Sequence, residues 1–141
     1  MANVVTTRVL EDGPRNFVIL RHNDSDGTAE NNVVAVDVTT LSGYVAADQY
    51  HDYLNCKIEE IRFATVGGIG VKLYWAASTN KLAWAAPPVY SDIDDFREFG
   101  GLPNETFGLG GSTGNLLVTT VNQAAGSAYN LIIRIAKGST R

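Results

Sequence analysis

The chain has 141 residues, of which 45% are hydrophobic and 18% are charged, and its formal net charge is −4. These values indicate one folded globular domain and argue against intrinsic disorder. They also argue against nucleic acid as a partner, because the 11 Lys and Arg residues are scattered, and against a membrane helix, because no apolar run approaches the roughly 20 residues that one needs.

The N-terminal residues and the cysteine content indicate the compartment. The segment "MANVVTTRVLEDG" alternates in polarity and lacks the basic region followed by an apolar region that a secretory signal has. Cys56 is the only cysteine, so an internal disulfide is impossible. We therefore expect a chain that is made in a reducing cytoplasm and stays there, or in something assembled there.

Alternation of apolar and polar residues with a period of two recurs along the chain and predicts β-strands, whereas helical periodicity is almost absent. The strands predicted in this way cover residues 4–11, 17–22, 33–38, 71–75, 81–86, 115–121 and 128–136. The layout predicts two hairpins with polar loops: 17–22 with 33–38 across residues 23–32, and 115–121 with 128–136 across "NQAAGS".

Residues 56–65 also have strand character, but their alternation is interrupted. Two apolar pairs are each in phase and differ from one another by one position: Cys56 with Ile58, and Ile61 with Phe63. A β-bulge at the two adjacent glutamates between them would place all four side chains on one face. A helical turn is the competing interpretation.

Seven or eight short strands separated by Gly, Pro and Asn turns predict an all-β fold. We expect an antiparallel, jelly-roll-like β-sandwich (or a barrel) that forms a single domain over residues 1–141, with a long Gly-rich loop at 87–114 and at most one short helix, at 45–54. Six side chains of two strands are expected to face the core: Val71, Leu73, Trp75, Leu131, Ile133 and Ile135.

The segment "GGSTG" (110–114) matches the G-x-S-x-G pattern of a serine hydrolase, in which the serine sits between a strand and a helix. Here a predicted strand follows Ser112. Both histidines, His22 and His51, precede the serine, whereas in that fold the histidine follows it. The same glycines lack the Lys of a phosphate-binding loop. We therefore expect no enzyme activity and no cofactor.

Acidic residues raise the question of a metal site. Asp24, Asp26 and Glu30 in the loop 23–32 offer oxygen ligands for calcium, but their spacing and flanks differ from those of an EF-hand. Asp and Gly also suit a turn for local reasons, so calcium binding by this loop stays open. The three aspartates of "SDIDDF" (91–96) favour a capped helical turn or a solvated face over a metal site.

Trp75 and Trp84 could form a platform on which a sugar stacks, as in a carbohydrate-binding module. Both lie in strands of alternating polarity, which favours packing in the core. Exposure distinguishes these two interpretations, because a carbohydrate-binding module loses the feature that supports it if both tryptophans are buried.

Five segments, in this order, resemble a family of small virion proteins of tailed bacteriophages: "RVLEDGPRNFVI", "CKIEEIRFA", "VKLYW", "DFREFGGLPN" and "GSAYNLIIRIAKG". The most distinctive pieces are "EDGPRN" (11–16) and "FGGLPN" (99–104). The resemblance implies a non-enzymatic structural component of the virion, a β-sandwich that decorates or cements the capsid by binding the major capsid protein. A neck, tail or baseplate adaptor is the alternative within virions. The resemblance supplies no catalytic residues, and it implies partners among virion proteins. We expect the chain to act as a homo-oligomer or in many copies on the particle.

A candidate protein–protein interface lies in residues 96–107, which place several apolar side chains in a Gly-rich segment: Phe96, Phe99, Leu102, Pro103 and Phe107. Such side chains either fold back and cap the core or anchor a neighbouring subunit or the capsid shell. Gly100 and Gly101 would let the backbone bend, and Pro103 would limit the entropy lost on docking. The sequence leaves both alternatives open.

Overall fold

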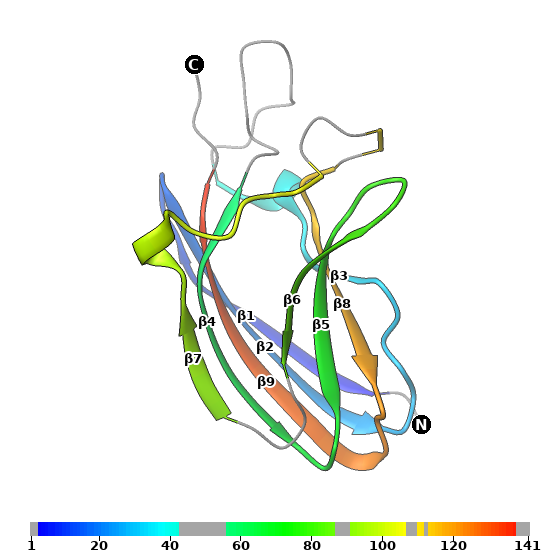
Figure 1. The fold of residues 1–141 in the computed structure, drawn as a ribbon. Helices are drawn as coiled ribbons and strands as arrows, with labels where there is room; N and C mark the ends of the chain where they lie inside the picture. The colour runs from blue at the N-terminus through cyan, green and yellow to red at the C-terminus, as the bar shows by residue number, and fades with distance from the viewer. Residues whose placement is uncertain (1–2, 43–55, 87–90, 107–109, 112, 138–141) are drawn as a thin grey trace.

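The structure, a computed structural model, describes residues 3–42, 56–86, 91–106, 110–111 and 113–137. Two antiparallel sheets pack face to face (Figure 1), one with the strand order β1-β2-β9-β4-β7 and the other with the order β3-β8-β5-β6. The strands are β1 (Val4–Asp12), β2 (Asn16–Asp26), β3 (Val33–Val36), β4 (Lys57–Val66), β5 (Gly70–Trp75), β6 (Lys81–Ala86), β7 (Ser91–Asp95), β8 (Leu116–Val121) and β9 (Ala125–Ala136). Two 3₁₀ helices, η1 (Val38–Thr40) and η2 (Arg97–Phe99), complete the regular structure of these ranges, which contain no helix with the length and hydropathy of a membrane span.

The winding is that of a jelly roll. Strand β2 pairs with β9, β3 with β8, β4 with β7, and β5 with β6. These pairings arise when one long antiparallel hairpin is rolled up, so that successive strand pairs fall in the two sheets by turns. Strand β1 is added outside the roll, next to β2. The predicted jelly-roll-like antiparallel sandwich is therefore confirmed, with nine strands in place of seven or eight.

The ninth strand is β7, which lies within the region 87–114 that the sequence predicts as a long loop. Its residues, "SDIDD", do not alternate in polarity, and β7 forms an edge of the larger sheet by pairing with β4. The helical turn predicted for its aspartates is therefore wrong, whereas the alternative, a solvated face, agrees with the exposure of Asp92 and Asp95. The helix predicted at 45–54 lies outside the described residues.

Both predicted hairpins are wrong. The first predicted hairpin would join β2 and β3, which contain most of residues 17–22 and 33–38, but these strands belong to different sheets. The second would join β8 and β9, which also belong to different sheets. In a jelly roll most connections cross from one sheet to the other, and only β5–β6 is a hairpin within the roll. The predicted loop 23–32 is also shorter than expected, because β2 continues to Asp26.

The bulge predicted in residues 56–65 is present. The register between β4 and β9 shifts between Ile58 and Glu60. Four apolar side chains on both sides of the shift are buried, as expected: Cys56, Ile58, Ile61 and Phe63. The helical alternative for this segment is therefore wrong, and β4 can run across the whole sheet with one continuous apolar face.

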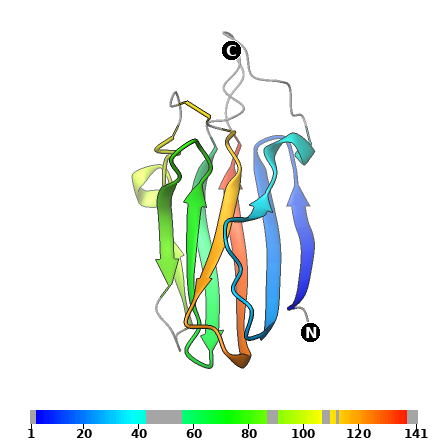
Figure 2. The ribbon, with the colours of Figure 1, turned by 90° about the vertical axis from the view of Figure 1, so that its right-hand side faces the viewer.

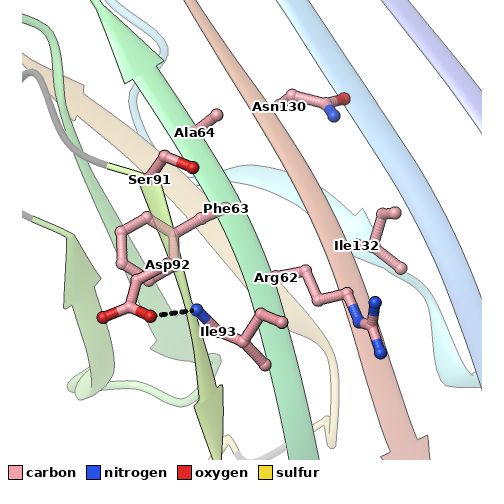
Figure 3. A pocket seen from close by; sticks show the side chains of 8 residues that line it. All are labelled: Arg62, Phe63, Ala64, Ser91, Asp92, Ile93, Asn130 and Ile132. Atoms are coloured by element: carbon pink, nitrogen blue, oxygen red, sulfur yellow. Dashed lines mark hydrogen bonds between the residues drawn. The ribbon is translucent and has the colours of Figure 1, made fainter.

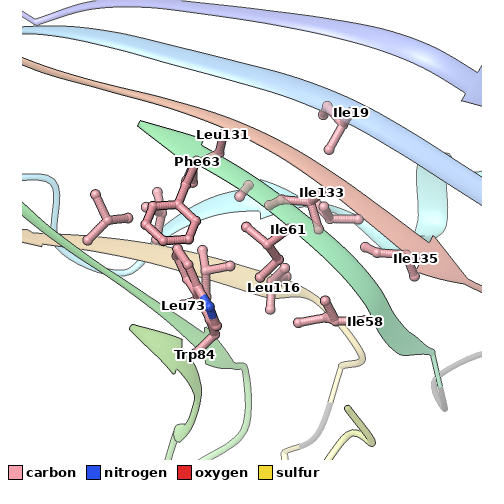
Figure 4. Packing of buried hydrophobic residues seen from close by; sticks show 14 of the residues in the cluster. Ile19, Ile58, Ile61, Phe63, Leu73, Trp84, Leu116, Leu131, Ile133 and Ile135 are labelled. Atoms are coloured by element: carbon pink, nitrogen blue, oxygen red, sulfur yellow. The ribbon is translucent and has the colours of Figure 1, made fainter. Parts of the chain in front are cut away.

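The core lies between the two sheets (Figure 4), and the face predicted for β5 and β9 is confirmed. The six residues predicted to face the core are at most 1% exposed: Val71, Leu73, Trp75, Leu131, Ile133 and Ile135. Phe63 and Trp84 meet edge to face inside this core, with ring centroids 5.1 Å apart. Large apolar side chains from both sheets therefore fill the space between them.

Candidate protein-binding site

The chain leaves β7 through Phe96 and makes a tight turn, η2, before returning to β4. Figure 1 shows η2 as a coil that projects at the end of β7. The N–H of Phe96 donates to the carbonyl oxygen of Glu59 (2.8 Å), and the N–H of Gly101 donates to the carbonyl oxygen of Phe96 (2.9 Å). Leu102 and Ile58 exchange two backbone hydrogen bonds of 2.7 and 3.0 Å. The turn is therefore anchored to β4 on both sides.

A network of charged groups holds the outside of the turn. Arg97 donates through its Nε and one terminal nitrogen to the two carboxylate oxygens of Asp95, at 3.0 and 2.6 Å. The same terminal nitrogen lies 3.1 Å from Glu60. Hydrogen bonds from the Arg97 side chain and backbone lower the pKa of Asp95 to about 2, so this carboxylate remains ionised at neutral pH. A planar guanidinium that grips one carboxylate at two points restricts the geometry of the turn.

Gly101 is required where the turn closes. Its φ of +93° lies in the left-handed region, and a Cβ added there would stand 3.1 Å from both the Ile58 carbonyl oxygen and the Cβ of Lys57. Other residues would meet backbone strain and crowding at this point. Gly100 also has a positive φ, of 81°, but a Cβ there would meet nothing.

The structure separates the five residues of the predicted interface. Phe96 and Leu102 are half-buried and pack against the core. Phe99 is 79% exposed, the largest exposure among the apolar side chains that the structure shows as exposed. Pro103 is also exposed, and Phe107 lies outside the described residues. Both alternatives for the region therefore hold, for different residues: Phe96 and Leu102 cap the core, while Phe99 faces outward.

This arrangement suits an aromatic anchor. A phenyl ring at the tip of a turn that two backbone pairings and a bidentate ion pair hold in place loses little conformational freedom when it enters a pocket of a partner. The sequence predicted the aromatic residues but not their support by Asp95, Arg97 and Glu60. Glu60 lies 37 positions from Arg97, and no local pattern connects them.

The residues considered for calcium are not brought together. Glu30 is buried and accepts hydrogen bonds from Arg21, from Tyr129 and from Asn23 (2.9 Å). Asp26 accepts from the backbone of Thr28. Within the described ranges, no group of three or more His, Cys, Asp or Glu side chains is placed to hold a metal ion.

The buried group around Glu30 also affects Tyr129. Burial, together with the hydrogen bond to Glu30, raises the pKa of Tyr129 well above its ordinary value.

Both tryptophans are buried, at 1% for Trp75 and 7% for Trp84. Neither offers a flat surface to a sugar, so the feature that supported a carbohydrate-binding module is lost. The serine of the possible hydrolase motif, Ser112, lies outside the described residues.

A shallow hollow lies on the outer face of the five-stranded sheet, over β4, β7 and β9 (Figure 3). Ala64 leaves room between larger neighbours, among them Arg62, Ile93 and Ile132. Two of the polar side chains that line the hollow have partners: Arg62 donates to Glu60 (2.8 Å), and Asp92 accepts from the backbone of Ile93 (2.7 Å). We therefore regard η2, and not this hollow, as the candidate site.

Fold and site together define a jelly-roll β-sandwich that presents the side chain of Phe99 on the turn η2. We call this turn braced, because backbone hydrogen bonds to β4 and the ion pair of Arg97 with Asp95 support it. No family model and no curated protein matches the sequence. Similar solved structures include KdgF from Halomonas sp. (10% identity over 94% of this chain and 78% of that chain, TM-score 0.34) and the cysteine peptidase peruvianin-I from Thevetia peruviana latex (11%, 97% and 66%, TM-score 0.38). A cupin superfamily protein from Desulfitobacterium hafniense is similar at 8% identity over 95% of this chain and 77% of that chain, with a TM-score of 0.31. Likenesses this distant carry no argument about the family or the activity of the chain.

Proposed function

We propose that the chain is a non-enzymatic structural protein of a tailed-phage virion, a decoration or cement protein that binds the major capsid protein in many copies. The observation that carries the proposal is the exposed Phe99 on its braced turn, because aromatic anchors contribute most of the binding energy at protein–protein contacts. The resemblance of five chain segments to small virion proteins supports the same function. The jelly roll is compatible with it, since viral capsid domains use this winding among many others.

A neck, tail or baseplate adaptor remains the alternative within the virion, and it would use the same anchor. The two differ in where the chain sits on the particle, which labelling of the bound protein in electron micrographs reveals. Binding to heads supports decoration, and binding confined to tails or necks supports the adaptor.

The test of the anchor is the variant Phe99→Ala. We expect its affinity for purified particles to fall by roughly 30-fold, which corresponds to about 2 kcal/mol. Its melting temperature should stay that of the wild type, because Phe99 contributes little to the core. The matched control is Leu82→Ala, which truncates another exposed apolar side chain, 54% exposed, on β6 of the other sheet.

Each outcome decides something. Reduced binding by Phe99→Ala with unchanged melting, and no effect of Leu82→Ala, supports docking through η2. Equal binding by all three proteins would exclude Phe99 as the anchor. Wild-type chain that binds neither heads nor tails would argue against a virion function as a whole.

A further inference from the structure

Strand β1 is the least covered of the nine strands in the described ranges. The larger sheet has five strands and the smaller one four, and β1 lies at the outer edge beyond β2 (Figure 2). All nine of its residues are exposed. Four of them are aliphatic and are between 40% and 61% exposed: Val4, Val5, Val9 and Leu10. A long strand edge with exposed aliphatic residues is a template for pairing with another chain.

The other free edges carry the usual protection against such pairing. Strand β7, at the opposite edge of the same sheet, carries three aspartates in five residues. In the other sheet the edges are β3, which is only four residues long, and β6, which begins with Lys81 and has a bulge where its register with β5 shifts. Residues 4–9 of β1 have no proline and no bulge, and their one charge is Arg8. A bulge and two acidic residues appear only at the far end of β1, after Val9. The segment 4–9 is thus a regular, unprotected edge.

Opposite residues of neighbouring antiparallel strands share a face, which fixes how β1 is oriented. Val5, Thr7 and Val9 pair with Asn23, Arg21 and Ile19, whose side chains are all buried. These three β1 residues therefore lie on the inner face of the sheet, and Val4, Thr6 and Arg8 lie on the outer face.

We propose that β1 pairs antiparallel with β1 of a second copy of this chain, about a two-fold axis at Thr7, to join two five-stranded sheets into one. In this register Val5 lies opposite Val9 of the second copy and Thr7 opposite its own equivalent. Thr6 lies opposite Arg8, and Val4 lies opposite Leu10 at the bulge. Every exposed aliphatic residue of β1 thus meets another one, and polar residues meet polar residues.

Charge and polarity exclude the neighbouring registers. Residues that face the same side of the joined sheet must lie opposite one another, so the axis can pass only through a residue and not between two. An axis at Arg8 would bring two arginines directly opposite each other, which is destabilising. An axis at Thr6 would place Arg8 opposite Val4 and Val5 opposite Thr7. The axis at Thr7 brings no two arginines together and pairs no polar residue with an aliphatic one. It also keeps the acidic ends of the two strands at opposite ends of the pair.

The surface area that the two β1 strands would bury predicts how tightly the two copies associate. One pair of strands buries less than the roughly 1,200–2,000 Å² of a stable complex, so we expect weak association of the free chain. Copies bound side by side on a particle would pair more readily, because their effective concentration is higher. The inference itself does not rest on the proposed function, since the free chain suffices to test it.

The register is tested by cysteine cross-linking. Directly opposite residues have Cα atoms about 4.5–5.5 Å apart, within the range of a disulfide. We expect Thr7→Cys to form a covalent dimer under mild oxidation at least about tenfold faster than Thr6→Cys or Arg8→Cys, whose equivalents are offset by two residues and stand too far apart. The wild type supplies the baseline, because its Cys56 is buried. Equal rates for the three variants would overturn the proposed pairing.

The interface is tested by sedimentation of the wild type at concentrations up to roughly 1 mM. We expect a monomer–dimer equilibrium that Val9→Lys weakens at least about tenfold, since edge charges block strand pairing. The matched control is Ile93→Lys, on the opposite edge of the same sheet and 50% exposed, close to the 54% of Val9. A wild type that stays monomeric, or equal effects of the two lysine variants, would refute the proposal.

Discussion

The β1 side and the β7 side of the larger sheet contact the rest of the sandwich through different interactions. One row of paired residues crosses all five strands of this sheet and shows the difference. From β1 to β7 this row contains Thr7, Arg21, Leu131, Phe63 and Asp92. On the β7 side, Phe63 packs against the indole of Trp84 from the other sheet, with an angle of 70° between the rings. On the β1 side the corresponding residue, Arg21, is buried against Glu30.

The difference follows from the segment that each inward side chain faces across the core. Phe63 faces Trp84, which belongs to the strand β6. Arg21 faces the connection from β2 to β3, whose backbone groups have no partner in a regular ladder. Glu30 supplies their anchors: its N–H donates to the hydroxyl of Thr120 (2.9 Å), and its carbonyl accepts from the N–H of Thr120 (3.0 Å). Apolar packing joins two strands, whereas a buried polar network joins a strand to an irregular segment.

The largest effect is expected from breaking the polar side. Glu30→Ala leaves the guanidinium of Arg21 buried without its carboxylate, and removal of one partner of a buried ion pair costs about 3–5 kcal/mol of unfolding free energy. Glu11→Ala is the control, because Glu11 is half-exposed and 3.9 Å from Arg134, and should cost less than about 0.5 kcal/mol. Denaturant unfolding measures both. Similar small losses would mean that Arg21 finds another partner or water.

A smaller loss is expected on the apolar side. Asp94→Ala removes the carboxylate that accepts a 2.7 Å hydrogen bond from the indole nitrogen of Trp84. Loss of the acceptor leaves this donor without its partner and should lower the unfolding free energy by about 1–2 kcal/mol. Asp92→Ala is the control, since the Asp92 carboxylate accepts from the neighbouring backbone at an exposed site. Equal stability of the two variants would show that packing of Trp84 against Phe63 suffices without the hydrogen bond.

The smallest expected effect is a loss of stability at high pH, which comes from Tyr129 in the polar network on the β1 side. Burial, together with the hydrogen bond to Glu30, raises the pKa of Tyr129 in the folded chain, whereas an unfolded Tyr has a pKa of about 10. Above that pH the unfolded chain loses the proton that the folded chain keeps, so the unfolded state is favoured. The stability from Tyr129 is complete below pH 10 and falls as pH rises, by about 0.8 kcal/mol at half a unit above.

The variant Tyr129→Phe isolates this group. It lacks the titrating hydroxyl, so its unfolding free energy should fall less between pH 9 and pH 10.5 than that of the wild type, whatever its stability at neutral pH. Denaturant midpoints over this range give both slopes. Parallel slopes would mean that Tyr129 titrates equally in both states and that its network is open to solvent.

The residue order alone predicts much of the fold. Alternation in "VKLYW" and "AYNLIIRIA" predicts which side chains face the core, because the two faces of a strand are determined by spacing within the strand itself. The phase change in "CKIEEIRFAT" predicts the bulge for the same reason. Strand β7 does not follow from the sequence, because its aspartates do not alternate with apolar residues. Both predicted hairpins are wrong, because alternation says nothing about which strand lies alongside.

Tertiary structure alone decides the environments. Asp24, Asp26 and Glu30 look equivalent in the sequence, but Glu30 turns inward because Arg21 and Tyr129, which are 108 positions apart, meet there. Phe96 and Phe99 are three positions apart in one Gly-rich segment, yet only Phe96 has the core beneath it. In each case the deciding neighbours come from other strands, and chain order does not contain their positions. What the sequence determined by itself is therefore the pattern within each strand, and the sheet pairing decided which residues are buried, bonded or left free to bind.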